Sequence, residues 1–317
     1  MGLKRILTTI FLCWWQLSGF SQSAEVKSYL AEITSIIKNK SIVANNIDWV
    51  KYEKDLAFLS QNINEVDSCR RVLDYITVVL RKAGDRHSAF IDKQGVGKLY
   101  APSQPKQAEG RLIDAHTGYL KVPGIMSFND SVKDAFRDNI QQHIKKLDTE
   151  NEITGWIVDL RHNTGGDLRT TLAGLNALIK DGVVGYFIDL KNKRTKIYSY
   201  GQSFMGRGNF YKIKKRFPPI AVLIDSFSAS SGEMAAMSFI GLRNVRTFGQ
   251  PSAGYTTANE PIRLSSGVIL ALAYSYAADR KKRVYRDRII PDVLVKENTL
   301  TADGTLDAAK KWTMRQK

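Results

Sequence analysis

The chain has 317 residues, of which 43% are hydrophobic and 25% charged, and its formal net charge is +16. The composition is that of an ordinary globular protein with enough length to bury a large core, and the chain shows no internal repeat or low-complexity tract. The positive charge suits an anionic membrane or cell-envelope surface, whereas nucleic acid is the weakest partner because the chain carries no nucleic-acid motif.

The N-terminus predicts export. Lys4 and Arg5 precede the apolar residues 6–20, and the small and polar residues 21–24 follow. This order is that of a secretory signal peptide over residues 1–23. A retained anchor is the alternative, because the apolar stretch is intermediate in length between a signal peptide and the ~20 residues that span a bilayer. In either case the body of the protein is expected in the periplasm, outside the cell, or anchored at the membrane and facing outwards.

Residues 24–99 are predicted to form a helical domain. Apolar residues recur at helical spacing in two stretches, which begin near Val26 and Cys69. Cys69 is the only cysteine outside the leader, so it is expected to be a core residue without a disulfide partner. Gly84 stands where a helix C-cap is expected, and "DRHSAF" follows it directly.

The polar segment 100–110 carries two prolines and predicts a linker, after which strands alternate with helices. The expected strands are 118–125, 154–161, 218–225, 244–250 and 267–276, and the expected helices are 129–147, 168–182 and 230–242. This is an α/β order with mostly buried strands over residues 111–317. Residues 183–217 contain short alternating runs and many basic residues, and they predict a hairpin-like cap insertion over a cleft.

Two turns follow buried strands and carry the residues of interest: "DLRHNTGGDL" (159–168) and "DSFSASSGE" (225–233). In an open α/β sheet, ligands collect where strands lead into helix N-termini. A helix N-terminus offers unpaired N–H groups that suit a developing oxyanion, and a Gly-Gly turn lets a second backbone approach the same point. A serine in the second turn is therefore a candidate nucleophile.

Serine needs a base, and the chain has four histidines. His143 lies on an amphipathic helix, and His116 precedes a strand without a supporting motif. His162 lies in the Gly-Gly turn, and His87 lies in the sharp turn after Gly84. Spacing and composition favour His87 over His162 only slightly.

Four motifs in the same order, "VDLRHNTGGDL", "VLIDSFSASSGEM", "FGQPSAGYT" and "IIPDV", together with "GDRHSAF", resemble the C-terminal-processing, or tail-specific, serine peptidases of clan SK. Within that family the overlap is greatest with a lantibiotic-cleaving branch. The resemblance implies a crotonase-like (ClpP/crotonase) α/β spiral core. It also implies an N-terminal helical bundle and a small cap. The PDZ domain that is common in the family is expected to be absent, since residues 90–118 are too few to form one.

Matching the serine motif residue by residue implies that Ser230 is the nucleophile. Ser231 and Gly166 match the residues whose N–H groups form the oxyanion hole. The lysine of the lysine-using branch falls on Tyr255, and a phenol that ionises near ~10 is a poor base at neutral pH. The resemblance therefore points to the histidine-using branch, with His87 as the base.

The third catalytic group is left open by the resemblance. Relatives add a glutamate that orients the histidine, and Asp287 lies in about the right region, although a bare Ser-His dyad fits the lantibiotic-cleaving branch. The implied activity is an exported serine peptidase that cleaves near the C-terminus of peptides or proteins through an acyl-enzyme, without metal or cofactor. A non-catalytic ligand-binding protein on the same fold and an esterase-like hydrolase are the alternatives. The resemblance also suggests antimicrobial peptides of the lantibiotic type as substrates, whereas the sequence itself indicates neither the natural substrate and cleavage site nor the oligomeric state.

Overall fold

The computed structural model describes residues 22–200, 211–296 and 303–316. The leader expected over residues 1–23 therefore lies outside the described residues except for its last two. In the described part, no helix is both long and apolar enough to cross a bilayer.

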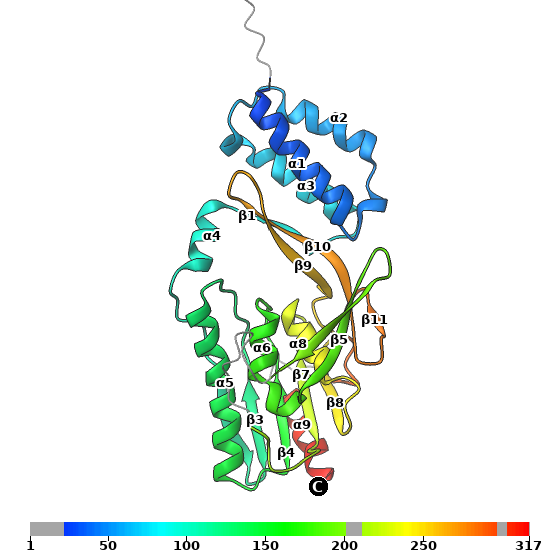
Figure 1. Ribbon diagram of the computed structural model, residues 1–317. Coiled ribbons are helices and arrows are strands. Elements are labelled where there is room, and N and C mark those ends of the chain that lie inside the picture. The colour runs from blue at the N-terminus through cyan, green and yellow to red at the C-terminus, as the bar shows by residue number, and fades with distance from the viewer. Residues whose placement is uncertain (1–21, 201–210, 297–302, 317) are drawn as a thin grey trace, which may run out of the picture.

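Three helices form the N-terminal part of the molecule: α1 (Ala24–Lys40), α2 (Trp49–Ser60) and α3 (Arg70–Lys82), with the short 3-10 helices η1 (Ala44–Asn46) and η2 (Val66–Ser68) between them. Ser23 and Asp48 cap the first two helices by accepting hydrogen bonds from backbone N–H groups. Their apolar stripes meet in a core that also contains Leu270 and Leu272 of a long strand, β10. The helices are therefore packed against a sheet, as Figure 1 shows at its top.

That first sheet is antiparallel and is built around β10 (Ile269–Ala278). One edge of β10 pairs with β9 (Thr257–Arg263) and β11 (Val284–Tyr285), and the other pairs with β1 (Ala89–Ile91) and β5 (Gly182–Asp189). β6 (Arg194–Ser199) extends the sheet beyond β5. The first part of the segment expected to be a cap insertion, up to residue 199, thus forms a hairpin that is hydrogen-bonded into this sheet.

The second sheet has the strand order β12-β8-β7-β4-β3-β2. Its strands are β2 (Glu109–Asp114), β3 (Thr117–Lys121), β4 (Gly155–Asp159), β7 (Ile220–Ile224), β8 (Val245–Gly249) and β12 (Val293–Leu294). From β3 to β12 the neighbours are parallel, and only β2 is antiparallel to its neighbour. β4 and β7 are completely buried, as near-continuous apolar runs between parallel neighbours require.

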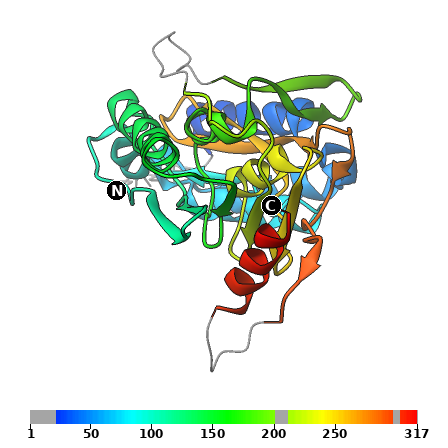
Figure 2. The same ribbon diagram turned by 90° about the horizontal axis from the view of Figure 1, so that it is seen from below.

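Helices cover both faces of this second sheet. The largest core joins one face to α5 (Asp130–Glu150), α6 (Leu168–Gly174), α7 (Asn176–Ile179) and α8 (Ser231–Phe239). The other face packs against α9 (Gly304–Arg315), which is seen apart from the other helices in Figure 2. The α/β fold class is confirmed by this arrangement.

Several elements differ from the expectation. The helix expected over 168–182 is broken into α6 and α7 and ends at Ile179; the next residue, Lys180, has a φ of 70°, and the chain turns there towards β5. Helix α4 (Lys93–Tyr100), α9 and the strands β1, β2 and β9 were not predicted. β9 lies at the edge of its sheet, and polar and charged residues interrupt its apolar ones. Hydrophobic periodicity therefore does not reveal it as a strand.

Candidate active site

Three loops meet at the carboxyl ends of the parallel strands β3, β4 and β7. Ile125, after β3, forms an isolated parallel bridge with Gly166, which follows β4. Ala229, after β7, donates its N–H to the carbonyl oxygen of Asn163 at 2.9 Å. The strand order therefore brings the Gly-Gly turn and the serine turn into contact, as expected for a ligand site in an open α/β sheet.

Ser230 begins α8 with an unusual backbone conformation. Its φ is 54° and its ψ is −121°, in a region that non-glycine residues rarely occupy. Such a conformation persists only where the surrounding structure enforces it, and it is found in nucleophilic serines on sharp strand-to-helix turns. The side chain of Ser230 is half-buried.

Gly165 and Gly166 lie directly against Ser230 and Ser231. A Cβ atom on Gly165 would lie 2.7 Å from the Cβ of Ser230, and a Cβ on Gly166 would lie 1.7 Å from the carbonyl oxygen of Ile125. Both glycines have a positive φ, 96° and 112°. No other residue type can therefore bring this backbone so close to the serine turn.

The backbone N–H groups of Gly166 and Ser231 belong to neighbouring residues in space and could bind one acceptor together. The carbonyl oxygen of Gly166 accepts a hydrogen bond from Ser231 Oγ at 2.5 Å, so the two residues are adjacent in space. Neither N–H group has an acceptor among the described residues, whereas the N–H of Gly165 is bound to Asn163 Oδ1 at 2.9 Å. Two free N–H donors at the head of a helix can stabilise an oxyanion.

Asn163 is a residue of this site that sequence reasoning missed. Its side chain is buried, its Nδ2 donates to the carbonyl oxygen of Val122 at 3.0 Å, and its Oδ1 accepts from Gly165. Because its own carbonyl oxygen accepts from Ala229, this one residue ties all three loops together. Only its place in "HNTGG" could have drawn attention to it.

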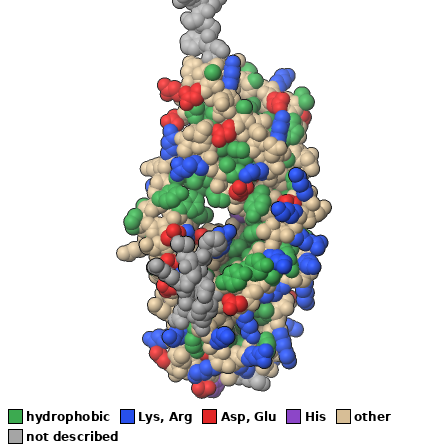
Figure 3. All heavy atoms as spheres, in the orientation of Figure 1, with side chains coloured by type: hydrophobic (Ala, Val, Ile, Leu, Met, Phe, Trp, Pro, Cys, Tyr) green, Lys and Arg blue, Asp and Glu red, His purple; other side chains and the backbone are tan. Residues whose placement is uncertain are grey.

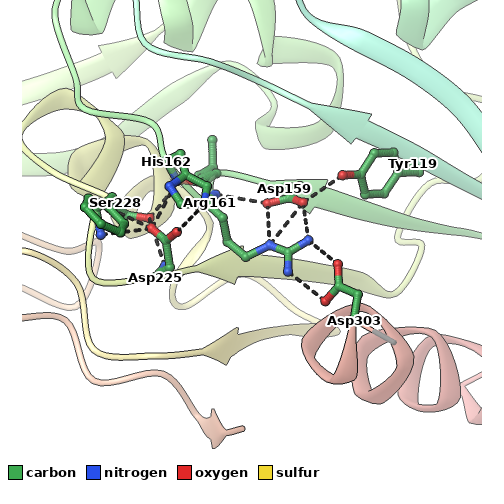
Figure 4. A network of polar contacts seen from close by, with 9 residues as sticks. Tyr119, Asp159, Arg161, His162, Asp225, Ser228 and Asp303 are labelled. Carbon is green, nitrogen blue, oxygen red and sulfur yellow. Dashed lines mark hydrogen bonds and ion pairs between the residues drawn. The ribbon is translucent and has the colours of Figure 1, made fainter. Parts of the chain in front are cut away.

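Asp225 and Ser228 hold the base of the serine turn. Asp225 Oδ1 accepts hydrogen bonds from the N–H groups of His162, Phe227 and Ser228 at 2.9–3.0 Å. Ser228 Oγ donates to the carbonyl oxygen of Leu160 at 2.8 Å and accepts from the N–H of Asp225. The hydroxyl of Ser228 is thus engaged in structure, and Figure 4 shows this cluster.

Beside this cluster, Arg161 is held between two carboxylates, as Figure 4 shows. It contacts Asp159 at 2.6 Å and makes two 2.7 Å hydrogen bonds to the carboxylate of Asp303, the N-cap residue of α9. Asp159 is 1% exposed and also accepts from the hydroxyl of Tyr119. Burial, together with the charge of Asp159, raises the pKa of Tyr119, so the phenol stays protonated as a donor. The network anchors the turn that carries Gly166 to strands β3 and β4 and to α9.

His87 lies between α3 and β1 and is held from several sides. Its N–H donates to Asp85 Oδ1 at 2.8 Å, its carbonyl oxygen accepts from Asn259 Nδ2 at 2.9 Å, and its ring Nδ1 lies 2.9 Å from Thr257 Oγ1. Burial lowers the pKa of His87 below the ordinary value of 6.5, and the charge of Asp85 opposes this shift only in part. The imidazole is therefore neutral near pH 7, which is the form that a base requires.

A chain of contacts connects His87 to Ser230. The rings of His87 and Tyr255 meet edge to face with centroids 5.4 Å apart, and the N–H of Tyr255 donates to Glu233 Oε2 at 2.8 Å. The same oxygen accepts from the N–H of Ser230 at 2.9 Å. Glu233 is completely buried, which raises its pKa, and Ser252 and Gly254 donate to its other oxygen. Glu233 thus caps the N-terminus of α8 and also joins two loops.

Asp287 lies away from the ring of His87. Its carboxylate contacts Arg86 Nη2 at 3.4 Å, and its side chain is 73% exposed. In the part of the chain that the structure describes, the hydrogen-bonding partners of His87 are Asp85, Thr257 and Asn259, and Asp287 is not among them. The structure thus brings Gly166, Ser230 and Ser231 together, connects them to His87, and leaves Asp287 apart.

The other histidines have different surroundings. His162 stacks on Phe227 with ring centroids 5.0 Å apart, has a side chain 66% exposed, and contacts Asp225 Oδ2 through Nε2 at 3.3 Å. His116 binds the carbonyl oxygen of Glu152. Among the described residues, no group of three or more His, Cys, Asp and Glu side chains has the arrangement of a metal site.

Comparison with known proteins agrees with the predicted family, both in sequence and in fold. Residues 116–295 match peptidase family S41. The nisin-resistance protein of Lactococcus lactis subsp. lactis is 27% identical over 296 residues, which cover 90% of this chain and 89% of that protein.

Two solved structures share the fold. A lipoprotein from Streptococcus agalactiae superposes with a TM-score of 0.79 at 23% identity, over 92% of this chain and 97% of that one. The photosystem II D1 C-terminal processing protease superposes with a TM-score of 0.58 at 13% identity, over 89% of this chain and 96% of that one. The similarity to both structures extends over nearly the whole described chain.

Proposed function

Because this chain belongs to peptidase family S41 and is a serine-type peptidase, we propose that it is an exported enzyme that cleaves peptide bonds near the C-terminus of peptide or protein substrates. Ser230 is the nucleophile and His87 is its base. The oxyanion hole consists of the N–H groups of Gly166 and Ser231. The observation that carries this proposal is the strained Ser230 at the head of α8, beside two N–H groups that have no acceptor in the part of the chain that the structure describes.

The mechanism is an acyl transfer in two steps. Ser230 Oγ attacks the scissile carbonyl carbon while His87 takes the hydroxyl proton, and the carbonyl oxygen becomes an oxyanion held by the two N–H groups. His87 then gives its proton to the leaving amine, and the C–N bond breaks. Water, deprotonated by His87, attacks the acyl-enzyme and releases Ser230 and the product carboxylate. The low pKa of His87 supports this role, because a neutral imidazole is needed at the start.

Antimicrobial peptides of the lantibiotic class are the proposed substrates. The support is the likeness to the nisin-resistance protein, which spans nine-tenths of both chains. The surface is hollowed below the N-terminal helices, and hydrophobic side chains gather on both sides of the hollow (Figure 3). Such a hollow suits a peptide with apolar side chains.

The decisive experiment compares the purified wild-type protein with Ser230→Ala and His87→Ala on a mixed peptide library that includes nisin, with products read by mass spectrometry. Each substitution is expected to lower kcat by about a thousandfold or more. Ser226→Ala, an exposed serine of the same turn, is the matched control and should keep full activity. An active Ser230→Ala protein would refute the assignment. Cleavage of other peptides but not of nisin would refute only the lantibiotic substrate.

Export is proposed from the basic and apolar order of residues 1–23. Fractionation of cells that express the full chain, followed by N-terminal sequencing of the mature protein, tests it. A new N-terminus near residue 24 in the exported fraction supports a cleaved leader, and an intact chain in the membrane fraction supports an anchor. A cytosolic intact chain would contradict both.

A further inference from the structure

The ring of His87 is held by a threonine where histidine-using serine hydrolases commonly place a carboxylate. Thr257 Oγ1 lies 2.9 Å from Nδ1 of His87, and two residues further along β9, Asn259 Nδ2 binds the carbonyl oxygen of the same histidine at 2.9 Å. Side chains two positions apart in a strand point to the same face, so one face of β9 holds both the ring and the backbone of His87.

We propose that Thr257 is the positioning residue of His87: its hydroxyl oxygen accepts the hydrogen bond from Nδ1–H and so fixes the tautomer whose Nε2 is free to take the proton of Ser230. This inference rests on the proposed peptidase function. The proposed catalytic group is then Ser230, His87 and Thr257, and its third residue is uncharged. It also explains how Asp287 can be engaged with Arg86 without leaving the histidine unsupported.

The position of Thr257 is tightly constrained. Its backbone lies opposite Tyr276 in the ladder between β9 and β10. The preceding residue, Thr256, is buried and donates from Oγ1 to the carbonyl oxygens of Tyr285 and Asp287 at 3.1 and 2.9 Å. A β-branched side chain in a strand has few χ1 rotamers, so the hydroxyl direction is set by the backbone. Thr257 thus meets the main requirement of a positioning residue, which is rigidity.

A neutral partner orients the imidazole but adds no negative charge beside it. The titratable and charged groups around His87 are Asp85 in its own turn, Arg86 next to it, and Tyr255 at the ring. Glu233 lies behind Tyr255, and Asp287 lies behind Arg86. Asp85 uses Oδ1 on the N–H groups of His87 and Ser88 and Oδ2 on the hydroxyl of Ser88, so its hydrogen bonds go to the turn and not to the ring. The ring therefore lacks a bound carboxylate among the described residues.

The test uses Thr257→Val, Thr257→Ser and Thr257→Asp in the full-length protein. Thr257→Val preserves shape but removes the acceptor, and it should lower kcat about tenfold or more with KM unchanged. Thr257→Ser keeps the hydroxyl and should restore most of the activity. Thr257→Asp places a carboxylate at the ring and should move the acidic limb of kcat/KM upward by about one pH unit. Thr149→Val, which removes a hydroxyl bonded to Lys145 on the exposed face of α5, is the matched control and should change nothing.

A measurement that does not depend on activity separates this inference from the proposed function. In protein labelled with ¹⁵N-histidine, His87 of the wild type should show the Nδ1–H tautomer, assigned by its absence in His87→Ala, and Thr257→Val should give a mixture of tautomers. Unchanged kcat and tautomer in Thr257→Val would overturn the positioning role. So would a rate loss that Thr257→Ser does not restore. A wild-type protein that hydrolyses no peptide but shows the expected tautomer would overturn the proposed function and leave the Thr257 contact standing.

Discussion

Ser230, the proposed nucleophile, has a strained backbone. A residue with φ 54° and ψ −121° carries a strain of about 1–3 kcal/mol unless it is glycine. Residues at functional sites keep such strain because the geometry serves the chemistry, so stability and activity should conflict at this position.

Ser230→Gly is therefore expected to raise the free energy of unfolding by about 1 kcal/mol while abolishing activity, because glycine relieves the strain but offers no hydroxyl. Urea denaturation measures the change. Ser230→Ala is the control, since it also removes the hydroxyl but keeps the Cβ atom and the strain. Equal stabilities of the two variants would show that the backbone at position 230 is not strained.

With His87 as the proposed base, its pKa sets the acidic side of the pH dependence. Burial lowers this pKa below 6.5, and the base must be neutral, so kcat/KM should rise with pH through a pKa below 6.5 and then reach a plateau. The folded state binds the proton less readily than the unfolded state, so the contribution of His87 to stability is complete above pH 6.5 and declines as the pH falls below that value. Initial rates from pH 4 to 8 test this, and a limb above pH 6.5 would contradict it.

At the scale of elements, α9 and the Gly-Gly turn are joined by one ion pair. Asp303 both caps α9, through the N–H of Leu306, and binds Arg161 with two hydrogen bonds. Arg161 precedes Asn163 and Gly166 in the same turn. The C-terminal helix therefore supports the turn of the proposed oxyanion hole, although it lies on the far face of the sheet.

Asp303→Ala should lower the free energy of unfolding by about 1 kcal/mol for the lost cap and by roughly another 1–2 kcal/mol for the lost hydrogen bonds to Arg161. Asp48→Ala is the matched control, because Asp48 caps α2 through the N–H of Lys51 without such a pair. Thermal and urea unfolding of both variants give the difference. If both substitutions cost the same, the ion pair with Arg161 contributes nothing to stability.

At the scale of the whole molecule, the site is shared by two structural units. His87 follows the N-terminal helices and is bound to β9 of the antiparallel sheet, whereas Ser230 and Gly166 belong to the parallel sheet. A substrate peptide in the hollow between the units would contact both. The formal net charge of +16 then attracts anionic substrates and repels cationic ones as they approach.

Cleavage of a cationic peptide such as nisin should therefore accelerate as ionic strength rises, by a few-fold in kcat/KM between about 10 mM and about 150 mM salt, because screening weakens the repulsion. An anionic peptide with the same cleavage site should show the opposite trend, and a neutral one should show none. Initial rates at three salt concentrations measure this. A cationic peptide that slows as salt is added would indicate a local acidic binding surface.

The amino-acid sequence by itself determined the elements with strong local signals. These are the helices α1 and α3, the buried strands β4 and β7, the capped helix α5, and the two turns that carry Gly166 and Ser230. In each case, apolar periodicity or turn chemistry within a few residues is sufficient. Within these turns, Ser230, Gly166 and Ser231 were proposed from the resemblance to known peptidases and not from local pattern, and the residues alone favoured His87 over His162 only slightly.

Only the tertiary structure decided which distant residues meet. Thr257 is 170 positions from His87, Asp303 is 142 from Arg161, and Asp287 is 201 from Arg86. Such contacts depend on strand register and on how the sheets pack, and a one-residue shift in register would turn Thr257 to the other face of β9. The helix expected over 168–182 stops at Ile179 for the same reason, since β5 begins at Gly182 and pairs with β6 and β10, which outweighs the helical tendency of the last few residues. Local pattern thus indicated the two turns of the candidate site, and long-range packing decided which distant residues lie against them.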